Sequence, residues 1–308
     1  MSVDWLIPAL LTIVTAATPL VFAAVGEVVV EKAGVLNLGV EGMMIIGAIA
    51  AFATAVSTGN EFLAIIAGAG AGMLIALIFG VLTVYLQSNQ VATGLVLTIF
   101  GLGLSALIGH SYVGKTFDGL AKLNIPGLSD IPVIGPVLFG HDALVYLSVV
   151  SVAIVAWVLT RTRMGLLIRA VGENHDAAHS IGYSVTLVRL GAILFGGAMA
   201  GVGGAYLSVA YTPLWVENMT AGRGWIALAL VVFASWKPWR AFFGAYLFGG
   251  ITIIQLYAQG MGVEVSAQFL SMLPYIATIL VLVIISRDSA RARLDAPACL
   301  GKNFHASG

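Results

Sequence analysis

Residues 65–86 read IIAGAGAGMLIALIFGVLTVYL and contain no charged side chain. A helix needs roughly 20 predominantly apolar residues to cross the hydrocarbon core of a bilayer. Backbone groups cannot stay unpaired in lipid, so such a run is expected to be a helix, and the alternation typical of a transmembrane β-barrel is absent. The sequence therefore predicts an all-α, polytopic membrane helix bundle, with further apolar blocks at residues 91–108, 143–160, 187–211, 225–234, 241–257 and 269–286.

The composition of the whole chain agrees with a membrane protein. Of 308 residues, 60% are hydrophobic and only 9% are charged, whereas a soluble domain carries about 25% charged residues. The formal net charge is zero, so the overall charge indicates no nucleic-acid partner. The N-terminus lacks the basic region of a signal peptide, and residues 5–25 are expected to be the first span. The single cysteine, Cys299, lies in a polar tail.

Positive charges predict the orientation of the spans, because Lys and Arg accumulate in short cytoplasmic loops. With the loop 161–190 inside, alternation places the N-terminus outside and the C-terminus inside, with about nine spans and a range of about eight to ten. All but three of the 14 Lys and Arg residues then lie on the cytoplasmic side; the exceptions are Lys115, Lys122 and Arg223. The predicted organisation is a transmembrane domain 1–286 with an external loop 110–142, followed by a cytoplasmic tail 287–308.

Glycines recur at close spacing within several of these spans. Small residues four apart let helix backbones approach closely in lipid, so helix packing is the expected role of these glycines. They are Gly68, Gly70, Gly72, Gly101, Gly103, Gly196, Gly197, Gly201, Gly203 and Gly204.

Residues 109–116, GHSYVGKT, match the pattern of a nucleotide-binding loop. That pattern binds phosphate only between a strand and a helix, where the helix N-terminus holds the anion. Here it follows a membrane span, precedes no evident helix, and is assigned to the outside. We therefore expect a chance match and no ATP site in this chain.

The cytoplasmic loop 161–190 reads RTRMGLLIRAVGENHDAAHSIGYSVTLVRL. Its basic start suits the lipid headgroups, and the polar group at 173–176 can cap a helix. A short helix is predicted at 177–181, ended by Gly182 at a C-terminal capping position. The alternative is an ordinary surface loop.

Within this loop, the run RAVGENHDAAHSIGYS resembles the coupling loop of ATP-binding-cassette (ABC) importer permeases of the ribose and branched-chain amino-acid permease family. The resemblance implies that the loop docks on a separate ATPase subunit. It implies docking roles for Glu173, Asn174, Ala177, Ala178 and Gly182.

A second segment, 26–47, reads GEVVVEKAGVLNLGVEGMMIIG. Ionisable residues at such depth favour functional or bundle-interior positions. Asn37 and Glu41 would share a helix face if the stretch is helical, but its glycines make a broken helix equally plausible. The segment closely resembles a signature of nucleoside-type permeases in the same family, as do SNQVATGLVLT (88–98) and GRGWIALALVVFASWKPWRAFFGAYLFGG (222–250).

Polar groups in or beside apolar spans are candidates for the solute path, because an unpaired polar group in lipid costs several kcal/mol. The alternative for each is a structural hydrogen bond between helices. Amides offer donors and acceptors, which suits an uncharged solute, with a nucleoside first and a simple sugar second. The candidates are Asn37, Glu41, Asn89, Gln90, Thr93 and Gln255.

The resemblance implies a permease subunit of an ABC importer in the bacterial inner membrane, which translocates a small polar solute. A nucleoside is the first candidate for that solute. The partners it implies are an ABC ATPase that carries ATP and Mg, a related second permease and an extracytoplasmic solute-binding protein. This chain itself is expected to bind no cofactor and no metal. A simple-sugar or branched-chain amino-acid permease remains an alternative. An ion-coupled secondary transporter is the alternative of another class, while no nucleophile–base pair or metal motif favours an enzyme.

Overall fold

The computed structural model describes residues 6–123, 126–127, 129, 131, 134–260, 266–286 and 295–305. These residues form helices and connecting segments, and their only β contacts are two isolated bridges, Thr116 with Leu214 and Lys122 with Asp142. The predicted all-α fold is confirmed for this part of the chain. The remaining parts of the external loop and of the tail lie outside the described residues.

Within the described residues, seven helices are long and apolar enough to cross a membrane. A further helix, α12, has 20 residues, whereas α10 has only 11. The predicted count of nine spans and their orientation remain predictions. In chain order the elements are α1 (Leu6–Lys32), α2 (Val40–Thr58), α3 (Glu61–Gly80), η2 (Val81–Tyr85), α4 (Gln90–Gly109), η3 (His110–Tyr112), α5 (Ile134–Phe139), α6 (Ala143–Arg161), α7 (Arg163–Glu173), α8 (His175–Ser180), α9 (Val185–Tyr206), η4 (Leu207–Tyr211), α10 (Arg223–Phe233), α11 (Pro238–Gly260) and α12 (Ala267–Ser286).

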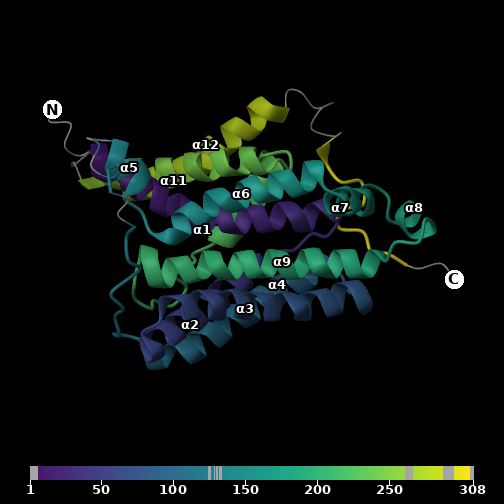
Figure 1. The fold of residues 1–308 in the computed structure, drawn as a ribbon, viewed down its shortest axis with the longest axis horizontal. Helices are drawn as coiled ribbons and strands as arrows, with labels where there is room; N and C mark the ends of the chain where they lie inside the picture. Colours follow the sequence, from purple (N-terminus) through teal and green to yellow (C-terminus); the bar gives the residue numbers. More distant parts are fainter. Residues whose placement is uncertain are drawn as a thin grey trace.

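The long helices run side by side, with α1 and α9 in the middle of the bundle (Figure 1). On one side of this pair lie α2, α3 and α4, and on the other lie α6, α11 and α12 (Figure 1). The short α5 and the beginning of α1 are at one end, while α7, α8 and the C-terminal segment are at the other (Figure 1). The two ends of the described chain are therefore at opposite ends of the bundle.

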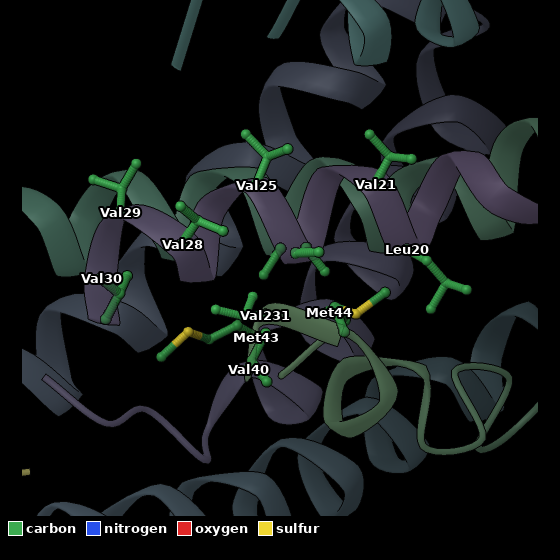
Figure 2. Close-up of a cluster of buried hydrophobic side chains, with 14 of the residues drawn as sticks. Leu20, Val21, Val25, Val28, Val29, Val30, Val40, Met43, Met44 and Val231 are labelled. Carbon is green, nitrogen blue, oxygen red and sulfur yellow. The ribbon is translucent and has the colours of Figure 1, made fainter. Parts of the chain in front are cut away.

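Helix α1 is longer and more central than the predicted first span, 5–25. It continues to Lys32 and carries Glu27 and Glu31 into the bundle, where both side chains are fully buried. The apolar run of this helix is interrupted by Glu27, Glu31 and Lys32, so apolarity alone underestimated the length of the helix. Figure 2 shows Leu20 and Val30 of α1 pointing to the side on which Met43 and Met44 of α2 and Val231 of α10 lie, whereas Val21 and Val25 point to the opposite side.

Glycines bring α2, α3 and α9 into close contact. A Cβ atom added to Gly201 would overlap the carbonyl of Gly68, and one added to Gly72 would overlap the carbonyl of Gly197. The predicted packing role is confirmed for these glycines, whereas Gly70 and Gly103 face open space. The backbones of α3 and α9 therefore touch at a distance that no larger residue allows.

We predict that Gly201→Leu destabilises the protein, because the added side chain must push α3 away from α9. Overpacking of this kind typically costs about 1–3 kcal/mol or more. The thermal unfolding midpoint of the purified protein in detergent measures the effect. The matched control is Gly70→Leu, which adds the same side chain to the same pair of helices at a position with no neighbour within 4 Å. Equal midpoints for the two variants would contradict the packing account.

Candidate functional site

The chain is not helical between α1 and α2, in residues 33–39. Of the two alternatives that the sequence left open, the broken helix is the one observed. Asn37 therefore lies outside the helix, while Glu41 lies in the first turn of α2. The Asn37 side chain is fully buried; its Nδ2 donates to Glu27 Oε1 at 3.0 Å, and its Oδ1 accepts from the Gly39 amide at 3.0 Å.

Glu41 joins this break to a second non-helical segment, residues 212–222, which precedes α10. Its side chain is 2% exposed, and its two oxygens accept three hydrogen bonds from the segment that begins α10. Oε1 accepts from Thr220 Oγ1 at 2.6 Å and from the Gly222 amide at 2.8 Å, while Oε2 accepts from the Gly224 amide at 2.6 Å. Gly222, at φ +83°, turns the chain into the helix. The carboxylate therefore occupies the positive N-terminus of α10, where free amides favour an anion.

A cavity of about 240 Å³ lies beside the same helix start, between α1, α11, α12 and α10. Arg223, Thr252 and Gln255 supply polar groups to its wall, and Tyr211 and Tyr275 supply aromatic rings. The Arg223 guanidinium donates from Nη1 to the carbonyl of Met219 at 2.9 Å and lies 5.9 Å from the centre of the Tyr211 ring.

Gln255 is the predicted solute residue that this cavity contains. Its side chain is only 8% exposed, and within the described part of the chain its carboxamide makes no hydrogen bond. The side chain forms part of the cavity wall, so its amide is available to an occupant of the cavity. A cavity next to such a group is suited to a hydrogen-bonding occupant, because an amide offers both donors and an acceptor.

The candidates at the start of α4 lie elsewhere. Asn89 caps this helix by accepting from the Ala92 amide at 2.9 Å, and Thr93 Oγ1 is 2.8 Å from Ser88 Oγ. Gln90 Oε1 accepts from the Leu36 amide at 2.8 Å. These bonds match the alternative interpretation, in which the polar groups join structural elements. The structure thus divides the six candidates among the broken-helix centre, the start of α4 and the cavity, and solute contact remains a prediction for all of them.

The short helix predicted in loop 161–190 is α8, at 175–180 rather than 177–181. Asn174 Oδ1 accepts from the Ala177 amide at 2.9 Å, and Gly182, at φ +94°, follows the helix. The expected cap and the expected glycine stop are both confirmed. Burial, and then the nearby Arg189 guanidinium, lower the pKa of His175, which suits the neutral ring that accepts from Arg189.

The exposure of the predicted docking residues differs sharply. Glu173, Ala177 and Gly182 are exposed, whereas Ala178 is 2% exposed and packs inward, so it supports the helix from beneath. Sequence reasoning missed two exposed apolar side chains beside α8, Ile181 at 72% and Tyr183 at 49%. Large apolar groups in an otherwise polar loop are the signal that could have revealed them.

The GHSYVGKT match has no nucleotide-binding geometry. Gly109 ends α4, and residues 110–112 form a single 3₁₀ turn. Lys115 Nζ lies 4.7 Å from the Tyr112 ring centre, and the Phe117 amide donates to the Pro213 carbonyl. No helix begins between Lys115 and Leu123, so the amide cradle that the motif requires is missing there. Among the described residues no group of three or more His, Cys, Asp or Glu side chains could hold a metal ion.

We predict that Glu41→Gln destabilises the protein, because an amide nitrogen then faces donors that need an acceptor. A hydrogen bond to a charged group contributes about 1.5–3 kcal/mol. The matched control is Glu61→Gln, the same change in the first turn of α3, where no helix start from another part of the chain depends on the carboxylate. Thermal unfolding in detergent measures both variants. A Glu41→Gln midpoint equal to that of Glu61→Gln would contradict the capping role.

Comparison with known proteins agrees with this architecture. Residues 9–284 match the family model described as the permease component of branched-chain amino acid transport systems. A putative glucose ABC transporter permease of Haloferax volcanii is 38% identical, with 95% of each chain covered. A nucleoside ABC transporter permease of Lactococcus lactis is 35% identical, with 91% of this chain and 92% of the relative covered. A guanosine ABC transporter permease of Bacillus subtilis is 31% identical, with 93% and 94% covered.

No solved structure matches the chain significantly. The family match covers nearly all of the described bundle, including both broken segments and the α7–α8 loop. The chain is a multi-pass membrane protein, and it belongs to the branched-chain amino acid and simple-sugar family of ABC transporter permeases.

Proposed function

We propose that this chain is the permease subunit that carries a nucleoside into the cell, with energy from an ATPase that docks on α8. The observation that carries the proposal is the presence of two features in one bundle: the short helix α8 at one end (Figure 1), and an interior cavity with polar groups in its wall beside the capped start of α10. ATP and Mg would bind the ATPase, because the one sequence match to a nucleotide loop lacks the required helix. Family membership leaves the ion-coupled transporter without support.

The docking surface is proposed to be the outward side of α8 and the turn that follows it. Ile181 and Tyr183 expose apolar side chains there, and Glu173 and Ala177 are exposed beside them. An apolar anchor within a polar rim is the usual composition of a protein interface. Asn174 and Gly182 fix the ends of the helix, and Ala178 fixes its seat on the bundle.

We predict that Ile181→Asp prevents co-purification of the ATPase and lowers uptake by at least about tenfold, as expected for an anchor residue. The side chain is exposed, so the protein itself should stay folded in the membrane. The matched control is Val113→Asp, which places the same charge on an exposed valine, 66% accessible, of the external loop. Retained ATPase and normal uptake in Ile181→Asp would show that α8 is not the docking site.

The proposed solute is a nucleoside, with a simple sugar as the second candidate. The similarity to nucleoside and guanosine permeases supports the first, and the similarity to a putative glucose permease supports the second. The cavity favours a nucleoside, because two tyrosines can stack on a base while Gln255 and Arg223 bind its polar edge. Arg223 donates only, so it suits carbonyl or ring-nitrogen acceptors.

We predict that excess uridine or adenosine abolishes radiolabelled nucleoside uptake, while excess leucine does not.

Gln255→Leu should slow uptake about tenfold, since one hydrogen bond to a buried group is lost. The matched control is Gln259→Leu, the same change in the same helix but outside the cavity wall. Competition by leucine without competition by nucleosides or sugars would place the chain in the amino-acid branch instead.

The remaining partners are proposed from the same family. Lactococcus lactis has two nucleoside ABC permeases similar to this chain, which supports a heterodimer of this subunit with a related second permease. A solute-binding protein would deliver the nucleoside to the outer face of the cytoplasmic membrane. The orientation that fits this proposal is N-terminus outside and C-terminus inside. The ATPase docks on α8 from the cytoplasm, and the C-terminal segment lies at the same end of the bundle as α8 (Figure 1).

A further inference from the structure

The C-terminal segment 295–305 lies against the bundle at the end that carries α7 and α8 (Figure 1). Its Cys299 and Phe304 are each only 9% exposed. The Cys299 amide donates to the Gly172 carbonyl at 2.8 Å, at the end of α7, and the Gly301 amide donates to the Gly34 carbonyl at 3.2 Å. The segment is thus a packed part of the fold that spans the distance from α7 to the α1–α2 break.

On one side the segment contacts α8. The Phe304 ring lies 5.3 Å from the His175 ring and 5.2 Å from the His179 ring, both in edge-on geometry. The same ring belongs to the buried cluster that contains Ala178, the inward-facing residue of α8. Any displacement of α8 by a docked protein must therefore move Phe304 or open this contact.

On the other side the segment contacts the start of α4 and, through it, the broken helix. Asn303 Nδ2 donates to the Gln87 carbonyl at 2.6 Å, and Gln90 Nε2 donates to Asn303 Oδ1 at 3.3 Å. The other end of the same Gln90 carboxamide accepts from the Leu36 amide at 2.8 Å. Leu36 is next to Asn37, within the break that leads to Glu41.

Arg189 ties the two sides together. The residue is 2% exposed, and its guanidinium makes three contacts, each with a different part of the chain. Nε donates to the Ala33 carbonyl at 3.3 Å, Nη1 donates to the Lys302 carbonyl at 2.9 Å, and Nη2 lies 3.2 Å from His175 Nδ1. A single rigid, planar group thus holds the break, the C-terminal segment and α8 in one arrangement.

We propose that segment 295–305 is a coupling element, which positions α8 relative to the α1–α2 break and transmits the ATPase-driven movement of α8 to it. Phe304 receives the movement and Asn303 passes it to Gln90. The inference rests on the proposed docking of the ATPase at α8. It assigns transport roles to residues that touch neither the ATPase-docking surface nor the cavity.

The test is the amount of nucleoside transported per ATP hydrolysed by the full complex in proteoliposomes. Phe304→Ala should leave the ATPase bound and hydrolysing ATP but lower this ratio by about 2- to 30-fold, the range of coupling changes caused by single residues. Phe304→Leu, which keeps an apolar contact with α8, should restore most of the ratio. The matched control is His305→Ala, an exposed neighbour in the same segment, which should leave the ratio unchanged.

Asn303→Ala provides an independent variant, because it cuts the contact with α4 and leaves the α8 side intact. It should lower the ratio in the same way. An unchanged ratio in both variants, or a loss of assembly in both, would overturn the proposal, the second result because the segment would then serve folding alone. Failure of the docking proposal gives a different result, since Ile181→Asp would then keep the ATPase whatever the tail variants do.

Discussion

The carboxylate of Glu41 at the start of α10 is the interaction on which the interior of this protein depends. Two chain segments leave helical geometry inside an apolar bundle, one before α2 and one before α10, and each exposes backbone groups that lipid cannot satisfy. Glu41 satisfies the second of these segments and ties it to the first, because it lies in the first turn of α2 and accepts three hydrogen bonds from the start of α10. Without it, the donors of the half-helix would be left unpaired in a medium where each costs several kcal/mol.

The cavity at Gln255 follows from this arrangement. A half-helix that begins inside the bundle leaves space before its first turn, and Arg223, the first residue of α10, lines that space. Non-helical backbone at membrane depth is tolerated where it is buried in protein or lines a cavity, and here it does both. The glycine contacts of α2, α3 and α9 keep the opposite side of the bundle closely packed. The proposed solute path therefore lies on the side where packing is looser.

Much of this architecture could be predicted from the sequence, because a long apolar run in lipid must form a helix whatever it packs against. The caps of α8 were also predictable, because Asn174 and Gly182 act through local backbone geometry. The continuation of α1 through Glu27 and Glu31 was not, because Glu27 is paired with Asn37 across the chain break and Glu31 with Trp236, 205 residues away in the sequence. For the same reason the sequence could not decide whether Asn37 and Glu41 share a helix.

The C-terminal segment 295–305 shows most clearly what could not be predicted from the sequence. By composition it is a polar tail, and only its distant contacts with Gly34, Gly172 and Arg189 show that it is packed. The inward position of Ala178 is likewise set by Phe304, 126 residues away in the chain by number but adjacent in space. Contacts between such distant residues leave no local pattern.

The central claim, that an ATPase drives this permease through α8, is tested most directly by site-specific photo-crosslinking in intact membranes. A photo-reactive residue at Ala177, exposed on α8, should crosslink to the ATPase subunit. The same probe at Thr58, exposed at the far end of α2, should not. Crosslinks to the ATPase from Thr58, with none from Ala177, would contradict both the docking site and the orientation of the protein in the membrane.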